Sequence, residues 1–320
     1  MTPRTIISAV VVCAASLAAF PASAQDYPSK AVEFIVPFAP GGGADASQRA
    51  FNKYAEPLVG HPLPINNKPS AAGTTGWAEM VRASNDGYTL TIATPPFNII
   101  PALVKPKETG YTLDQFTNIC VYAVVPDVIV VRKDSEYKTL EDLVTFAKAN
   151  PKKLAAANTG TLGADFMTTL LIEKATGIEM SQVPFSSGAL ALQAMLAGTT
   201  DVFVASTLYA VAQADTLVAL AIASDERDPL IPDVPTFTEL GYDVISKRLR
   251  VVAGPPGLPE NVVSYWADIC KQVTDNPEFQ AEMDTLGQPV SYAGPEEAAA
   301  MVTRMTADMQ AIVDTYKLAE

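Results

Sequence analysis

The chain has 320 residues, enough for two α/β domains, and it is 48% hydrophobic and 18% charged. Its net charge of −13 argues against a basic nucleic-acid-binding surface. Because His61 is the single histidine, metal sites built from several histidines are excluded, and no cysteine and histidine cluster has zinc spacing. A catalytic triad would depend on His61 alone, and no G-x-S-x-G nucleophile elbow is present.

The N-terminal segment has the pattern of a secretory signal peptide. Arg4 supplies a positive charge, the apolar run IISAVVVCAASLAAF follows, and the small residues ASA precede Gln25. The apolar run is shorter than the roughly 20 residues that a transmembrane helix needs. We therefore expect residues 1–24 to be removed during export.

Two cysteines, Cys120 and Cys270, remain in the predicted mature chain. An exported protein can join such cysteines in a disulfide. Two buried free thiols fit the sequence equally well. Since the sequence gives no distance between them, both alternatives stay open.

Strand and helix signals alternate in the first part of the chain. Apolar residues recur at helical spacing in ASQRAFNKYAEPLV, and short apolar runs bounded by turn residues indicate strands. The β-α-β-α-β order predicts a parallel sheet with helices on its faces. The predicted elements are strands over 32–38, 63–68 and 88–94 and helices over 46–59 and 74–84.

The middle of the chain repeats this alternation. NICVYAVVPDVIVVRK contains two strand-like runs with Pro126 between them, and Thr139 has the position of a helix N-cap. The further predicted elements are helices over 139–151, 166–177 and 187–199 and strands over 153–158, 181–185, 201–206 and 217–224.

The C-terminal part begins with a predicted strand in RLRVVAG and ends in helices. Two helices, over 260–273 and 277–287, precede a short strand over 289–293 and a last helix over 294–316. In this last helix, methionines and aliphatic residues form one apolar face, which indicates core packing. The face consists of Met301, Val302, Met305, Met309, Ile312 and Val313.

The two βα sets are joined near Pro126 and near residue 247, which predicts two lobes with the chain crossing twice between them. The first lobe would contain residues 25–126 and 248–320, and the second lobe residues 127–247. A cleft between two lobes is the usual place for a ligand.

The stretch VEFIVPFAPGGGAD connects a strand to a helix through three glycines, which is typical of an anion site. A P-loop would need a lysine that is absent here, and a dinucleotide fingerprint would need a glycine at Ala46 and an acid near Asn66. Both nucleotide interpretations therefore fail. Asp45 either caps the helix or orients the loop, and the cap is favoured.

Three further loops precede predicted helices and are rich in small and hydroxyl residues: NKPSAAGTTG, NTGTLGAD and PFSSGAL. The edge formed by the carboxyl ends of parallel strands carries the ligand in open α/β sheets. Apart from Lys68, none of these loops contains a cation. We therefore expect anion recognition by N–H dipoles and hydroxyls and not by ion pairs.

Several motifs in order resemble the substrate-binding proteins of tripartite tricarboxylate transporters, the Bug family. They are YPSKAVEFIVPFAPGGGAD, INNKPSAAGTTGWAEMVRASNDGYTL, VPFSSGALALQAMLAGTTDV and DPLIPDVPTFTELGY, and the similarity runs from Tyr27 to the last helix. The resemblance implies a two-lobed periplasmic binding protein of type II, a Venus flytrap. It also implies capture of a small organic carboxylate and its delivery to a two-component membrane transporter.

The resemblance implies that the first glycine loop and loops of the second lobe hold the ligand. Where many relatives have an acid, this chain has Ser206, which disfavours an amino-acid ligand and favours a di- or tricarboxylate or an aromatic acid. The predicted ligand-binding residues are Phe38, Ala39, Gly41, Gly42, Gly43, Ala72, Gly73, Thr94, Thr159, Gly160, Ser186, Ser187 and Ser206.

We thus expect a monomeric, non-enzymatic binding protein without a cofactor, a metal or a nucleic-acid partner. One alternative is an extracytoplasmic sensor that presents a carboxylate to a membrane receptor, which the sequence does not separate from transport. A second alternative is a nucleotide-dependent enzyme that uses the glycine loop. The absent lysine and the near absence of histidine argue against that enzyme.

Overall fold

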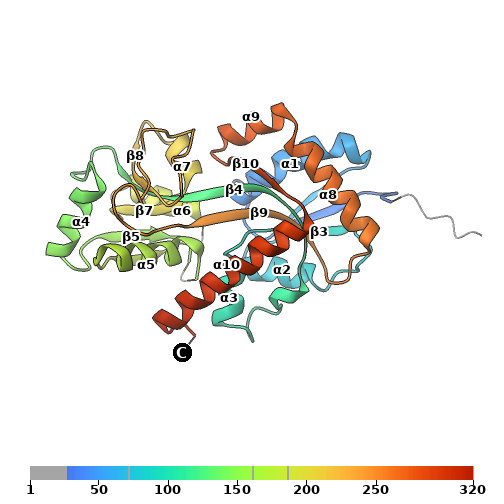
Figure 1. The fold of residues 1–320 in the computed structure, drawn as a ribbon, viewed down its shortest axis with the longest axis horizontal. Helices are drawn as coiled ribbons and strands as arrows, with labels where there is room; N and C mark the ends of the chain where they lie inside the picture. The colour runs from blue at the N-terminus through green and yellow to red at the C-terminus, as the bar shows by residue number, and fades with distance from the viewer. Residues whose placement is uncertain (1–26, 71–72, 161, 186, 320) are drawn as a thin grey trace, which may run out of the picture.

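The protein is described here by a computed structural model that covers residues 27–70, 73–160, 162–185 and 187–319. It forms two α/β lobes that lie next to each other along the long axis of the molecule (Figure 1). The predicted two-lobed α/β class is therefore confirmed. The predicted signal peptide, residues 1–24, lies outside the described residues and stays a prediction.

The first lobe is built on three short parallel strands, with β1 between β2 and β3. This pairing follows from the alternation of strands and helices, because each crossover helix returns the chain to the same end of the sheet. Its strands are β1 (Glu33–Val36), β2 (Ile65–Asn67), β3 (Thr89–Ala93) and β10 (Val290–Ala293), and its helices are α1 (Gly43–Val59), α2 (Thr74–Met80), α3 (Ile99–Val104), η2 (Leu113–Gln115), α8 (Glu260–Thr274) and α9 (Pro277–Thr285).

The second lobe has the same organisation, with β5 between β6 and β7 in parallel pairing. Thr139 caps α4 as predicted, since its hydroxyl accepts the N–H of Asp142 and the Asp142 carboxylate accepts the N–H of Thr139. The elements are β5 (Ala155–Asn158), β6 (Ser181–Pro184), β7 (Val202–Ser206), β8 (Leu217–Ile222), α4 (Leu140–Ala149), α5 (Ala164–Thr176), α6 (Gly188–Leu196) and α7 (Thr207–Ala212).

Two long antiparallel strands, β4 (Thr117–Arg132) and β9 (Lys247–Gly254), join the lobes (Figure 1). The prediction of two separate strands around Pro126 is wrong, because β4 is continuous through the proline. Pro126 is in register with Lys247, and the next N–H, that of Asp127, donates to the carbonyl of Ser246 at 2.9 Å. Proline removes one donor, but the ladder resumes at the next residue. The exact lobe boundaries stay a prediction.

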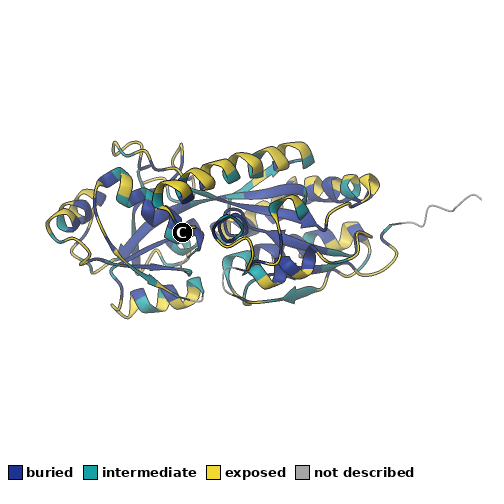
Figure 2. Cartoon of the chain, turned by 90° about the horizontal axis from the view of Figure 1, so that it is seen from below, coloured by how far each residue is buried: buried dark blue, intermediate teal, exposed yellow. Residues whose placement is uncertain are grey.

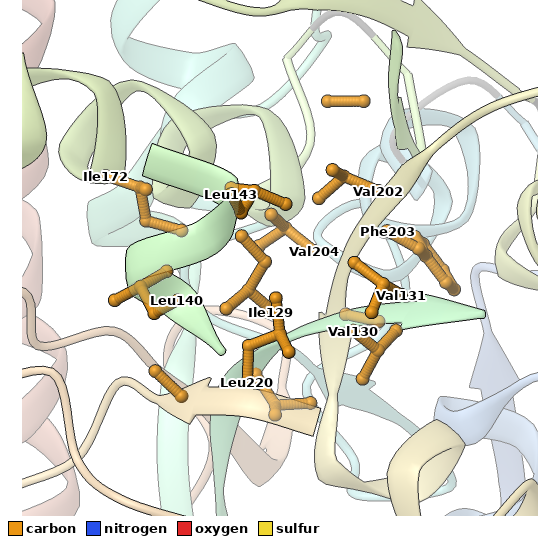
Figure 3. Close-up of a cluster of buried hydrophobic side chains, with 14 of the residues drawn as sticks. Ile129, Val130, Val131, Leu140, Leu143, Ile172, Val202, Phe203, Val204 and Leu220 are labelled. Atoms are coloured by element: carbon orange, nitrogen blue, oxygen red, sulfur yellow. The ribbon is translucent and has the colours of Figure 1, made fainter. Parts of the chain in front are cut away.

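Each lobe has its own hydrophobic core, and the buried positions follow the strands (Figure 2). In the first lobe, Phe34 packs edge to face against Trp266 with ring centroids 5.4 Å apart. Figure 3 shows the core of the second lobe, where side chains of β4 and β7 meet those of α4 and α5. Its labelled residues are Ile129, Val130, Val131, Leu140, Leu143, Ile172, Val202, Phe203, Val204 and Leu220.

The last helix, α10 (Pro295–Tyr316), packs with its predicted apolar face inward. Met309 and Val313 are buried in a cluster that also contains side chains of α3 and α5. The predicted core role of the methionine stripe is thus confirmed. The six-residue helices α3 and α7 were not predicted, because they are too short to show helical periodicity. No helix in the described part of the chain has the length and hydropathy to cross a bilayer.

A disulfide between Cys120 and Cys270 ties the central strand β4 to helix α8, with the two Cα atoms 6.6 Å apart. The alternatives that the sequence left open are thus decided in favour of a bond. It closes a loop with a sequence separation of 150 residues. Such a cross-link stabilises the fold mainly by restricting the unfolded chain.

We expect a double variant with Cys120→Ala and Cys270→Ala to lose about 2 to 5 kcal/mol of the free energy of unfolding. Urea denaturation followed by circular dichroism measures this loss. Wild-type protein treated with a reducing agent is the matched control and is expected to shift in the same direction. An unchanged midpoint in both would contradict a stabilising disulfide.

Candidate functional site

A cavity of about 790 Å³ is lined by loops from both lobes. It contains residues from the glycine loop, from the ends of β3, β5 and β7 and from the starts of α5 and α6. The sequence-predicted residues that line it are Phe38, Ala39, Gly42, Gly43, Thr94, Thr159, Gly160, Ser187 and Ser206. Their role in ligand binding remains a prediction. Ala72 and Ser186 lie outside the described residues.

The glycine loop presents the start of the 17-residue helix α1 to this cavity. Gly42 is the N-cap and has no side chain to accept a hydrogen bond. Within the described part of the chain, the N–H groups of Gly42, Gly43 and Ala44 donate to no protein acceptor. These are the free donors that every helix start carries, at the positive end of the helix dipole.

Asp45 organises the loop behind these donors. Its carboxylate accepts hydrogen bonds from the N–H of Gly41, from Arg49 Nε and from Asn67 Nδ2, each at 2.9 Å. Burial alone would raise the pKa of Asp45, but these hydrogen bonds hold it below its usual value. The favoured interpretation, a helix cap, is therefore wrong, and the alternative of a loop-orienting residue holds.

Two predicted site residues are placed away from the cavity wall. The N–H of Gly41 is already used by Asp45, and its φ of +83° explains the glycine. Gly73 donates its N–H to the carbonyl of Ser70, and a Cβ there would lie 2.8 Å from the Trp77 ring. Both glycines therefore serve the shape of their loops.

Thr94, which follows the last residue of β3, is a predicted site residue whose hydroxyl lacks a hydrogen-bond partner among the described residues. Its side chain is buried, lines the cavity, and its Oγ1 has no hydrogen-bond partner among the described residues. A buried hydroxyl without a partner costs free energy. Thr94 is thus available to a polar group of a ligand.

On the opposite wall, Thr159 holds the second-lobe loop in place. Its N–H and its hydroxyl both donate to Asp165 Oδ2, at 3.0 and 2.7 Å. Ser187 is the N-cap of α6 and accepts the N–H of Leu190 at 3.3 Å. The hydroxyl donor of Thr159 is therefore committed to the protein, while Gly160 lines the cavity with its backbone.

Two buried arginines of β9, Arg248 and Arg250, line the cavity. The search of the loops for cations therefore missed two that line the cavity, while recognition without ion pairs stays a prediction. The search missed them because these side chains project from the first half of β9 and not from a loop. Residues i and i+2 of a strand face the same side, so the spacing in RLR was the available signal.

Arg248 is held by two carboxylates. Its Nε donates to Asp127 Oδ1 and its Nη2 donates to Asp165 Oδ1. Thr168 and Ser246 also donate to Asp127, at 2.6 and 2.8 Å. Burial opposes the charge of Arg248, but the two carboxylates raise its pKa above the usual value. Burial also raises the pKa of Asp127, against the effect of Arg248.

Arg250 has a different environment. Its Nε donates to Gln288 Oε1 at 2.7 Å, and Gln288 Nε2 donates in turn to the carbonyl of Gly43 at 2.9 Å. No carboxylate of the described residues forms an ion pair with Arg250. Burial lowers its pKa to about 10, so the guanidinium is charged at neutral pH.

The remaining lining is largely apolar. Phe38 and Phe97 meet edge to face with centroids 5.7 Å apart, and Leu162 and Phe185 line the cavity as well. Burial raises the pKa of Tyr209 to about 12, so its hydroxyl is a neutral donor. In the described part of the chain, no group of His, Cys, Asp and Glu residues could hold a metal ion.

Comparison with known proteins places this geometry in a family. The profile described as "Tripartite tricarboxylate transporter family receptor", TctC, matches residues 48–318. The chain belongs to this receptor family. The resemblance found in the sequence motifs is therefore confirmed.

Relatives of this TctC receptor cover most of its length. Protein BugT of Bordetella pertussis is 27% identical over 267 residues, which are 82% of each chain. The periplasmic binding protein BugD has a TM-score of 0.83 at 28% identity, over 91% of this chain and 99% of BugD. MatC from Rhodopseudomonas palustris, solved with bound malate, has a TM-score of 0.82 at 26% identity, over 90% of this chain and 100% of MatC. The chain thus shares the fold of the periplasmic binding protein BugD and of malate-bound MatC.

Replacing Arg248 by methionine leaves Asp127 and Asp165 buried without their cation. We expect this variant to lose about 3 to 5 kcal/mol of the free energy of unfolding, as urea denaturation measures it. The exposed Arg304→Met carries the same change of charge and is expected to stay within about 0.5 kcal/mol of wild type. Equal stability of R248M and wild type would contradict the role of Arg248 in this ion network.

Proposed function

We propose that this TctC receptor is a periplasmic solute-binding protein that captures a small organic carboxylate. It would deliver this ligand to a two-component membrane transporter of the tripartite type. The observation that carries the proposal is the start of α1, whose free N–H groups open into a cavity lined by both lobes. A carboxylate is the natural partner of such a helix start.

The wall chemistry supports an organic acid as the ligand. The N–H groups of Gly42 and Gly43 would bind the carboxylate, and the hydroxyl of Thr94 would accept or donate one further hydrogen bond. The rings of Phe38 and Phe97 would contact the carbon skeleton. Closure of the lobes would then exclude water and strengthen these polar contacts.

A ligand without an ammonium group fits the cavity better than an amino acid. The carboxylates in the described lining already have cations: Asp165 is paired with Arg248, and Glu108 is paired with Lys105 at 3.0 Å. An ammonium group would therefore find no free counter-ion there. This supports a di- or tricarboxylate or an aromatic acid, and the malate in the structure of MatC is of that kind.

We further propose that a single chain is sufficient for binding. Both walls of the cavity come from the same chain, so a second copy is not needed to complete it. The predicted signal peptide supports export, and membership of a transporter receptor family supports delivery to membrane subunits.

A thermal-shift screen of the mature protein tests the ligand class. The panel contains citrate, malate, succinate and benzoate, with aspartate as the amino analogue of succinate. We expect at least one of the acids to raise the melting temperature and aspartate to have no effect. The proposal fails if none of these acids, nor any other carboxylate of similar size, stabilises the protein.

The helix start can be tested with Gly42→Asp. A Cβ at Gly42 has ordinary space, 3.7 Å from the nearest carbonyl oxygen, and aspartate is a favourable N-cap. We therefore expect unchanged or slightly higher stability. The new carboxylate would repel the ligand and occupy a helix-start donor, weakening binding by at least about 100-fold.

Gly42→Ser is the matched control for this substitution, because serine also caps a helix but adds no charge. Calorimetric titration of both variants with the best acid of the screen measures the effect. Equal affinity of G42D and G42S for the acid would show that the start of α1 is not part of the binding site.

A further inference from the structure

The two arginines of the cavity differ in how their charge is balanced. Arg248 has Asp127 and Asp165 as counter-ions, so its charge is satisfied within the protein. Arg250 is 3% exposed, and its hydrogen bond within the described residues goes to the neutral side chain of Gln288. Asp127 favours the charge of Arg250 electrostatically, but no carboxylate of the described residues contacts its guanidinium. Arg250 therefore keeps charged donors in the cavity wall that a ligand anion can use.

The position of Arg250 is fixed by the glycine loop itself. Gln288 accepts from Arg250 Nε and donates to the carbonyl of Gly43, so one amide side chain bridges β9 and the start of α1. A Cβ placed on Gly43 would lie 3.6 Å from Arg250 Nη2. The guanidinium therefore stands directly beside the first turn of α1.

We propose that Arg250 forms a direct ion pair with the carboxylate of the ligand, together with the N–H groups of Gly42 and Gly43. This inference rests on the proposed function and adds the residue that selects for a negative charge. Arg250 Nη2 and the N–H groups of the helix start converge from two elements on one small volume. A planar guanidinium is suited to bind both oxygens of a carboxylate.

Gln288 is the positioning residue of this site. With Nε held by Gln288, the Nη groups of Arg250 are the ones left to face the cavity, and no described residue accepts from them. The unpartnered hydroxyl of Thr94 supplies a further polar group at the same cavity. The subsite thus combines a buried cation with a helix start, and Thr94 lines the same cavity.

Gly43 lies next to the same arrangement. A side chain there would lie 3.3 Å from Leu208 and close to both Arg250 and Gln288. The contact with Leu208 is tight, whereas the distances of 3.6 Å to Arg250 and 3.8 Å to Gln288 are ordinary van der Waals contacts. Position 43 thus adjoins both residues of the subsite.

The experiment compares wild type with Arg250→Met, Arg250→Lys and the exposed Arg304→Met. Two probes are used: sodium sulfate, against sodium chloride of equal ionic strength, and the best organic acid of the screen. Affinities come from calorimetry and stability from thermal and urea unfolding. Far-UV circular dichroism of each variant establishes folding, and R250K carries the test if R250M does not fold.

We expect R250M to bind the acid at least 100-fold more weakly than wild type and to lose the sulfate-specific rise in melting temperature. R250K should bind the acid about 10-fold more weakly, because an ammonium lacks the planar fork. R304M should equal wild type. Without ligand, R250M should be about as stable as wild type, since it loses no direct ion pair.

The outcomes separate this inference from the proposed function. If R250M binds the acid and responds to sulfate as wild type does, the inference is overturned and the proposed function stands. If no acid binds to wild type but sulfate acts through Arg250, the proposed function fails and the anion subsite stands. If neither probe stabilises wild type, or if ligand-free R250M unfolds much more readily and R250K binds the acid as wild type does, Arg250 is a structural residue.

Discussion

The antiparallel pairing of β4 with β9 is the constraint on which the rest of the molecule depends. Strand β4 runs through both lobes: residues 117–126 pair with β9, and residues 127–132 pair with β7 and β8 of the second lobe. Strand β9 in turn pairs with β3 of the first lobe. The two sheets are thus joined through one continuous strand. The pairing of β4 with β9 also carries Arg248 and Arg250 into the cavity between the lobes, because alternate residues of β9 face the same side.

Burial gives this cavity its electrostatic character. One guanidinium is paired with two carboxylates, and that network connects β9 with β4 and α5. The other guanidinium stands beside a helix start, where no carboxylate of the described residues contacts it. Charge interactions are stronger in such a low-dielectric wall than at the surface. This is how the proposed function places an anion inside a negatively charged protein.

Much of the fold could be predicted because it depends on local pattern. Apolar runs, helical spacing and the Thr139 cap gave most strands and helices. The continuous strand through Pro126 and the short helices α3 and α7 could not be predicted. In the first case tertiary pairing overrides a local breaker, and in the second case the elements are shorter than the period that would reveal them. Most residues of the predicted site do line one cavity, since parallel strands bring their carboxyl ends to one edge.

The sequence by itself determined the family, the two-lobed class and the glycine loop at a helix start, because short motifs and their order along the chain indicate all three. Only the tertiary structure decided which groups are free to act. Gly41 and Thr159 lose their donors to Asp45 and Asp165, while Arg250 gains a place beside Gly43 from a strand some 200 residues later in the chain. Hydrogen bonds and ion pairs depend on which groups are neighbours in space, and the sequence alone does not specify those neighbours.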